Sequence, residues 1–215
     1  MQADPSHMSL PENHRMLSNL VFPRPIALVT TVNAGGLVNV APFSFFGVVC
    51  AKPPMLGISL GKRNGREKDT LANARATGEL VVNLTTESMA ERINLAAMDF
   101  PPDHSELAAC GFTPVPARRV RPPRIAESPA HMECRVAQVM DLGGKHGSHS
   151  FLVAEVVLFH VRDELFSEGT PKSRDLKLLG RAGNDDYFGL GDRGRFEMKR
   201  LQYEEWSKGR EPPPG

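Results

Sequence analysis

Two strand-like runs separated by a pair of glycines constrain most strongly what this chain can fold into. Residues 26–32, Ile-Ala-Leu-Val-Thr-Thr-Val, form a β-branched run that predicts a buried strand. The glycine pair at 35–36 predicts a turn, and residues 37–40 predict a second strand running back along the first. Since Pro42 has no N–H to donate to the ladder, we expect it to end the pairing. The backbone groups left beside residues 43–46 could hold a flat heteroaromatic ring with a polar edge.

Most of the remaining predicted elements are also strands. Alternating apolar residues predict one buried face for residues 131–142, whereas residues 150–161 are apolar enough to be buried on both faces. Shorter strands are predicted for residues 55–60 and 80–84. Residues 112–130 carry five prolines and predict a long excursion between elements. Many strands with few helices indicate a mainly β fold, a β-barrel with helical insertions, and disfavour a doubly wound α/β sheet.

Short helices are expected between these strands. Asp69 is a plausible N-cap for a helix at residues 70–77, which Gly78 would close. Thr86 is expected to cap a second helix at residues 87–98.

The chain is expected to form one domain with two extensions. Residues 1–13 are polar and show no periodicity, and they predict a flexible leader. Residues 14–195 contain all the predicted strands and form the domain. Residues 196–206 predict a terminal helix, and the proline-rich end of the chain at 211–215 predicts a disordered tail.

Composition excludes several classes of function. The chain of 215 residues has a formal net charge of only +1, which argues against a nucleic-acid surface. It has no apolar run of the roughly 20 residues needed to cross a bilayer, so no membrane partner is expected. Cys50, Cys110 and Cys134 are odd in number and widely spaced, which suits reduced thiols and a cytoplasmic location.

Four segments of the chain carry a resemblance to a known family. They are Arg24-Pro25 with the strand-closing Thr30-Thr31; Asn39-x-Ala41-Pro42-Phe43-Ser44; Lys68-Asp69-Thr70 with Asn73 and the strand at 80–83; and Glu133-Cys134 ahead of the strand at 151–161. In this order, over about residues 15–190, they resemble the flavin reductase-like family, whose members bind FMN in a split β-barrel. The resemblance therefore implies an FMN-binding split β-barrel of Greek-key type.

The resemblance also implies an activity and partners. It implies an NAD(P)H:flavin oxidoreductase that uses FMN (or FAD) as cofactor, takes NAD(P)H as co-substrate and works as a homodimer. Reduced flavin would then pass to a partner monooxygenase or another electron acceptor. Two alternatives stay open: an FMN- or haem-binding carrier or sensor without turnover, and an oxidase of the pyridoxamine-phosphate type. The oxidase would need a second phosphate site, which arginines 118, 119, 121 and 124 could supply.

An anion-binding end and a ring-binding end are expected for the flavin. If Asp69 caps a helix, Thr70 lies in its first turn, where free N–H groups and the helix dipole favour a phosphate, and Lys68 adds a positive charge and Thr70 a hydroxyl. An ordinary capped surface helix would show the same spacing. Lys62 and Arg66 are secondary phosphate candidates. The full set of predicted cofactor-binding residues is Arg24, Thr30, Thr31, Asn39, Ala41, Pro42, Phe43, Ser44, Ser59, Arg63, Lys68, Thr70 and Arg181.

A few side chains have expected roles of their own. His149 is a weak candidate for the catalytic or nicotinamide side of the site. Arg181, with Tyr187 following, resembles a late arginine–tyrosine segment that lies near the flavin in relatives. Phe45 and Phe46 are expected to divide, one ring in the core and the other near the flavin or a subunit interface.

Other motif-like patterns carry no chemistry. Residues 189–194 match G-x-G-x-x-G, but no strand precedes them and too little chain follows for a βαβ unit, so they are not a dinucleotide fingerprint. His131, Glu133 and Cys134 lie on one predicted strand and cannot all face one way, so no metal site is expected. Cys134 is expected to be a buried structural thiol.

Overall fold

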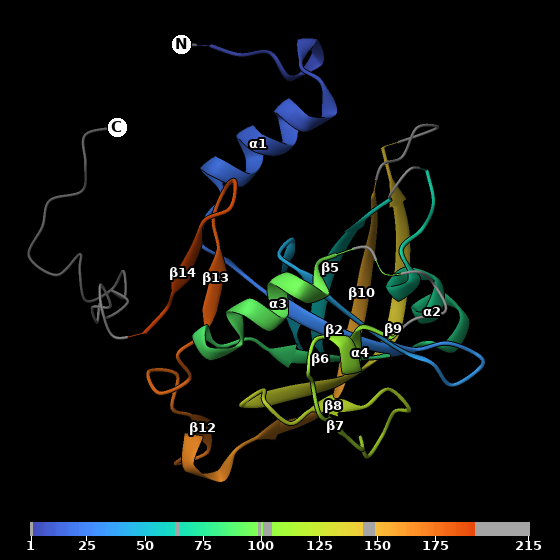
Figure 1. Ribbon diagram of the computed structural model, residues 1–215, viewed down its shortest axis with the longest axis vertical. Coiled ribbons are helices and arrows are strands. Elements are labelled where there is room, and N and C mark those ends of the chain that lie inside the picture. Colours follow the sequence, from blue (N-terminus) through green and yellow to red (C-terminus); the bar gives the residue numbers. More distant parts are fainter. Residues whose placement is uncertain (1, 63–64, 99, 101–104, 144–148, 192–215) are drawn as a thin grey trace, which may run out of the picture.

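The fold is built on one antiparallel sheet, seen in a computed structural model that describes residues 2–62, 65–98, 100, 105–143 and 149–191 (Figure 1). The sheet has seven strands in the order β3-β2-β6-β9-β10-β5-β4. Their bounds are β2 Ala27–Val32, β3 Val38–Phe43, β4 Phe46–Ala51, β5 Pro54–Gly61, β6 Glu79–Leu84, β9 Ala130–Leu142 and β10 His149–Val161. This mainly β architecture confirms the predicted fold class.

The two ends of the sheet meet, which makes it a barrel. β3 and β4 stand at opposite ends of the strand order, yet only residues 44 and 45 separate them in the chain. The Ser59 amide on β5 donates to the Phe45 carbonyl at 2.8 Å, so the connection is fastened to the far edge of the sheet. The sheet therefore curls until its first and last strands are neighbours, as a split barrel requires.

The expectation that Pro42 ends the hairpin is wrong. β3 continues through Pro42, which is paired with Leu28, and on to Phe43, which is paired with Ala27. The proline is tolerated because β3 is the last strand on its side of the sheet, where a missing N–H costs no ladder bond. The sequence pattern also did not predict β4.

Small sheets and helices complete the fold. β1 (Arg24–Pro25), β13 (Leu179–Arg181) and β14 (Tyr187–Gly189) form a three-stranded sheet, and two-stranded pairs join β7 (Pro114–Val115) to β8 (Arg124–Ile125) and β11 (Phe166–Ser167) to β12 (Thr170–Pro171). The α-helices are α1 Leu10–Leu20, α2 Asp69–Thr77, α3 Ala90–Ala96 and α4 Glu106–Ala109, and 3-10 turns cover Pro5–His7, Glu87–Met89 and Asp163–Leu165. None of the described helices is long and apolar enough to cross a membrane.

Several helix predictions need correction. α1 begins at Leu10, inside the segment predicted to be a structureless leader, and the Glu12 carboxylate accepts the Ser9 amide at 2.8 Å. The helix predicted at 87–98 is a 3-10 turn followed by the shorter α3, and Thr86 makes no side-chain cap bond. The residue type of Thr86 suggests a helix cap, but it does not reveal whether the hydroxyl has another hydrogen-bond partner. The helix predicted at 196–206 lies outside the described residues.

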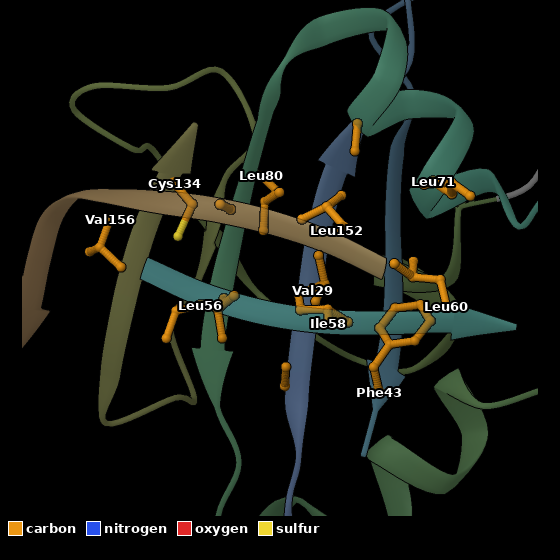
Figure 2. Close-up of a cluster of buried hydrophobic side chains, with 14 residues drawn as sticks. Val29, Phe43, Leu56, Ile58, Leu60, Leu71, Leu80, Cys134, Leu152 and Val156 are labelled. Carbon is orange, nitrogen blue, oxygen red and sulfur yellow. The ribbon is translucent and has the colours of Figure 1, made fainter. Parts of the chain in front are cut away.

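The barrel interior holds the main apolar core (Figure 2). Val29, Ile58, Leu80 and Leu152 point into it from four different strands. Cys134 is fully buried among them, and burial raises the pKa of its thiol to about 12, which confirms a structural cysteine. A second core lies beneath α3, around Leu28, Met89, Ile93 and Ile125.

Burial along β10 differs from the prediction of two buried faces. Ser150, Leu152, Ala154 and Val156 are buried, whereas the residues between them are only half-buried. β10 has one face in the barrel and the other at the surface, so an apolar composition was not evidence for a two-sided strand.

Candidate functional site

Two adjoining cavities form one groove across the end of the barrel. Their volumes are about 640 and 500 Å³, and Pro42, Lys68 and Ala97 line both, so the two cavities are neighbours and are together called the groove. The wall of the first also contains Asn39, Ala41, Arg66, Glu67, Asp69, Thr70, Ala96, Met98, Phe100 and Glu106. The wall of the second also contains His14, Arg15, Ser18, Arg24, Ile26, Ser44, Ile93, Asn94, Arg181, Ala182, Asn184 and Tyr187.

The N-terminus of α2 forms one end of the groove. Lys68 is the N-cap residue of α2, and its carbonyl accepts the amides of Leu71 and Ala72 at 2.9 and 3.1 Å. The helix begins at Asp69, so the expectation that Asp69 is the cap is wrong by one residue. The amides of Asp69 and Thr70 precede these bonded ones at the helix start, and with Lys68 beside them they favour an anion.

Thr70 and Asn39 fix this end of the groove to the sheet. The Asn39 side-chain amide on β3 donates to the Thr70 hydroxyl on α2 at 2.8 Å, and both residues are buried. Lys68 lies over the Phe43 ring, with Nζ 5.2 Å from the ring centroid. These contacts hold the helix start next to Pro42, where β3 presents its unpaired edge to the groove.

Glu106 is a wall residue that the sequence did not indicate. Its carboxylate accepts the Val40 amide on β3 at 3.0 Å, and the side chain is buried. Burial raises the pKa of Glu106 above its ordinary value, and the nearby Asp69 adds to this effect, while the Val40 amide opposes it. A carboxyl group in this position can therefore hold a proton more readily than an exposed one.

Arg24 is a positioning residue for the opposite end of the groove. Its guanidinium donates to the carbonyls of Ser18 and Val21, at the end of α1, and of Ala182, next to β13, at 2.6–2.7 Å. Burial, and then the charge of Arg181, lower the pKa of Arg24. Because these carbonyls engage the guanidinium, Arg24 clamps α1 to the small sheet, and its expected role as a cofactor-binding residue stays a prediction.

Arg181 and Tyr187 form a stacked pair in the groove wall. They face each other across β13 and β14, with the guanidinium carbon 4.2 Å from the centre of the Tyr187 ring. Arg181 also donates to the Asn184 carbonyl at 2.5 Å. The late arginine–tyrosine segment singled out in the sequence thus reaches the groove within the same chain.

Three rings form a column beside the groove. His14 stacks on Phe45 at 5.7 Å, and Phe45 stacks on His149 at 6.2 Å between ring centroids. Burial, followed by the charges of His14 and Lys68, lowers the pKa of His149. His149 does not line the groove, whereas His14 does. Phe45 and Phe46 were expected to divide between the core and the flavin site or an interface. Phe46 packs against the core, and Phe45 lies in the column of rings.

Eight of the predicted cofactor-binding residues line the groove, four do not, and one lies outside the described residues. The eight are Arg24, Asn39, Ala41, Pro42, Ser44, Lys68, Thr70 and Arg181. Thr30 and Thr31 are fully buried: Thr30 donates to the Pro123 carbonyl and Thr31 accepts from Asn73, so neither side chain can contact a cofactor. Phe43 is a core residue, Ser59 lines neither cavity, and Arg63 lies outside the described residues.

Metal chemistry has no support in the described part of the chain. No group of three or more His, Cys, Asp or Glu side chains there could hold a metal ion. The wall of the groove combines cations, a helix start and a strand edge with the side chains of Glu67, Asp69 and Glu106, and the first three features suit a phosphorylated, flat ligand.

Comparison with known proteins agrees with this geometry. A model of the flavin reductase like domain matches residues 17–178. A protein of Halalkalibacterium halodurans, BH2278, is 40% identical over 195 residues, covering 89% of this chain and 93% of its own. The structure of nitrilotriacetate monooxygenase component B from Bacillus cereus matches with a TM-score of 0.88 at 33% identity, covering 92% of this chain and 98% of that one. The 2-nitrobenzoate 2-nitroreductase NbaA of Pseudomonas fluorescens matches with a TM-score of 0.84 at 31% identity, over 94% and 98% of the two chains. The chain belongs to the flavin reductase-like family.

Proposed function

We propose that this protein is an NAD(P)H-dependent flavin reductase that binds FMN in the groove. The observation that carries the proposal is the coincidence, in a chain of this family, of an anion-binding helix start with an exposed strand edge in one groove. Both cavity volumes lie within the roughly 300–1,000 Å³ typical of small-molecule sites. Bound flavin would supply hydride acceptance, and the protein supplies binding and orientation.

The residues present fit the two ends of FMN. A phosphate needs positive charge and amide donors, which Lys68 and the first turn of α2 provide. The ring needs backbone groups and flat apolar surface, which the strand edge from Ala41 to Ser44 provides. Arg181 places a positive charge where it would stabilise negative charge on a reduced ring.

Anaerobic absorbance spectroscopy tests this function. We expect the FMN-loaded protein to lose its oxidised-flavin absorbance when NADH or NADPH is added, and at a much higher rate than free FMN does under the same conditions. The nucleotide that acts faster gives the donor preference. A bound flavin that stays oxidised with both nucleotides would instead support a carrier or sensor, and a protein that binds no flavin would refute the proposal.

Delivery of reduced flavin to a partner monooxygenase is the use we propose for the activity. It is supported by the 33% identity to a protein described as component B of nitrilotriacetate monooxygenase. A second candidate follows from the 31% identity to 2-nitrobenzoate 2-nitroreductase, in which a bound flavin would reduce an organic acceptor directly. Adding 2-nitrobenzoate to the NADH-reduced protein separates the two, because only the second function predicts its consumption without a partner.

We also propose that the protein works as a homodimer through an apolar face formed by α1 and β4. An apolar cavity of about 350 Å³ lies between them, lined by Leu17 and Val21 on one side and Phe45 and Phe46 on the other. Val48 and Val49 on β4 are 80% and 51% exposed, which is unusual for paired valines on a strand. Packing this apolar face against a second copy of the chain would remove its surface from water.

Substituting Val48 with aspartate is therefore expected to convert a dimer into a monomer, because it places a charge on the apolar face. Size-exclusion chromatography with light scattering measures the change in mass. Leu142→Asp is the matched control, since Leu142 is an exposed apolar residue at the end of β9, a strand that is not paired with β4. A wild-type protein that is already monomeric, or an unchanged mass for Val48→Asp, would contradict the proposed interface.

A further inference from the structure

A second polar cavity shares no lining residue with the groove. It has a volume of about 440 Å³ and lies where the 112–130 excursion crosses the start of β9 and the end of β10. We call it the arginine cavity, because its wall includes Arg118, Arg124 and Arg162, together with His131, His160 and Phe159. β7 and β8, which belong to the excursion, lie at the opposite end of the molecule from α1 (Figure 1).

Three arginines line this cavity. Arg124 donates to the Pro116 carbonyl at 3.1 and 3.3 Å, and Arg162 donates to the carbonyls of Ala126 and Glu127 at 3.0 and 3.2 Å. These bonds fix both side chains in place. Within the described residues, no carboxylate lies within 4 Å of the guanidinium nitrogens of Arg118, Arg124 or Arg162.

The nearest acidic side chains are already used by other donors. Glu133 is fully buried, and its carboxylate accepts the amides of Arg118 and Arg119 at 2.8 and 2.6 Å and His160 Nε2 at 2.6 Å. Glu127 accepts from Thr113 and pairs with Arg92 at 3.0 Å. The described residues that line the cavity therefore include three arginines and no aspartate or glutamate.

A buried imidazole in the wall has an unsatisfied nitrogen. His131 is 8% exposed, its Nε2 lies 2.8 Å from the Ile125 carbonyl, and its Nδ1 has no hydrogen-bond partner among the described residues. Burial lowers the pKa of His131 to about 4, and the charges of Arg124, His160 and Arg162 act in the same direction. Because the Ile125 carbonyl can only accept, Nε2 carries the proton, and Nδ1 is left as an unused acceptor that a headgroup carrying a proton, such as hydrogen phosphate, could satisfy.

We propose that the arginine cavity is a second ligand site that binds a small organic anion headed by a carboxylate or a phosphate. Guanidinium groups match the geometry of both headgroups through paired N–H donors. Val115 and the exposed ring of Phe159 offer apolar surface for the body of such a molecule. The inference depends on the charges and hydrogen bonds of this cavity, and it stands independently of the proposed flavin chemistry.

The chain offers a closely matched pair of variants to test the site. Arg118 and Arg119 are adjacent, exposed and donate their backbone amides to the same carboxylate, but only Arg118 lines the cavity. Phosphate and benzoate, as probes of the two headgroups, are titrated by calorimetry into the full chain at constant ionic strength, with FMN present. We expect saturable binding of at least one probe, weakened about tenfold in Arg118→Gln and unchanged in Arg119→Gln.

The outcome decides the proposal and the headgroup together. Binding of phosphate alone, or of benzoate alone, identifies the preferred group, and both results support the site. If neither probe binds at millimolar concentration, or if the two variants behave alike, the proposal is overturned. Arg162→Gln provides a second test from another element, and thermal melting of each variant confirms that the fold is intact.

Discussion

Replacing Lys68 with glutamine is expected to weaken FMN binding about ten- to hundredfold, as loss of one charge-assisted hydrogen bond to a phosphate predicts. Lys68 is the N-cap residue of α2 and lines both halves of the groove, so its ammonium group and the helix amides act on the same anion. The loss should be smaller for riboflavin, which has the same ring but no phosphate. Quenching of flavin fluorescence during titration measures both dissociation constants.

Lys62→Gln is the control for this prediction. Lys62 follows the end of β5, is itself a candidate phosphate ligand by sequence, and lines neither half of the groove. The Lys62→Gln substitution is expected to leave FMN affinity unchanged. An effect as large as that of Lys68→Gln would show that FMN affinity falls with the loss of any nearby positive charge, not with loss of the Lys68 contact. Equal affinity of Lys68→Gln and the wild type would place the phosphate elsewhere.

The strands were predictable because their signals are local. Apolar alternation and β-branched runs located β2, β5, β6, β9 and β10 to within a few residues. The strand order was not predictable in the same way, because pairing β6 with β9 joins segments about fifty residues apart. β4 escaped notice since Gly47 and Cys50 interrupt its apolar pattern, and its pairing with β5 rather than local sequence defines it.

The site was predictable where its residues are consecutive. Lys68 and Thr70 lie at the start of one helix, and Ala41, Pro42 and Ser44 lie at the end of one strand, so both motifs reach the groove together. His14 and Glu106 were missed because they arrive from α1 and α4, far away in sequence. Motif membership also does not reveal the direction of a side chain.

Thr30 and Arg24 show what a motif leaves out. Thr30 is part of the family motif, yet its side chain is fully buried and donates to the Pro123 carbonyl in the excursion. Arg24 lines the groove, yet its donors are committed to carbonyls of Ser18, Val21 and Ala182. Only the three-dimensional structure shows these partners, because they are backbone carbonyls. Every residue type has one, so the sequence does not indicate which carbonyl accepts the bond.

His131 is expected to make the stability of the protein depend on pH. Its folded-state pKa of about 4 lies below the ordinary value of 6.5, so the unfolded chain takes up a proton first as the pH falls. The contribution of His131 is therefore complete above pH 6.5 and is lost between 6.5 and 4. The free energy of unfolding should fall by up to about 3 kcal/mol across this window.

Urea denaturation of the wild type and His131→Gln at a series of pH values measures this contribution. Glutamine does not titrate, so the variant should be less stable at pH 7, where the hydrogen bond to Ile125 is lost, but its stability should change less on acidification. The difference between the two curves isolates His131 from His149, whose pKa is also lowered by burial, by His14 and by Lys68.

His7→Gln is the matched control, because His7 is exposed on the first 3-10 turn and has no buried residue beside it there. Its stability curve should run parallel to that of the wild type.

Should His131→Gln also give a curve parallel to the wild type, the imidazole would have to be protonated equally in the folded and unfolded states. That result would mean that another interaction cancels the lowering of the His131 pKa by burial and by the charges of Arg124 and Arg162. An anion held in the arginine cavity is one such interaction. A repeat of the titration with phosphate present would separate compensation by a ligand from a ring that is open to water.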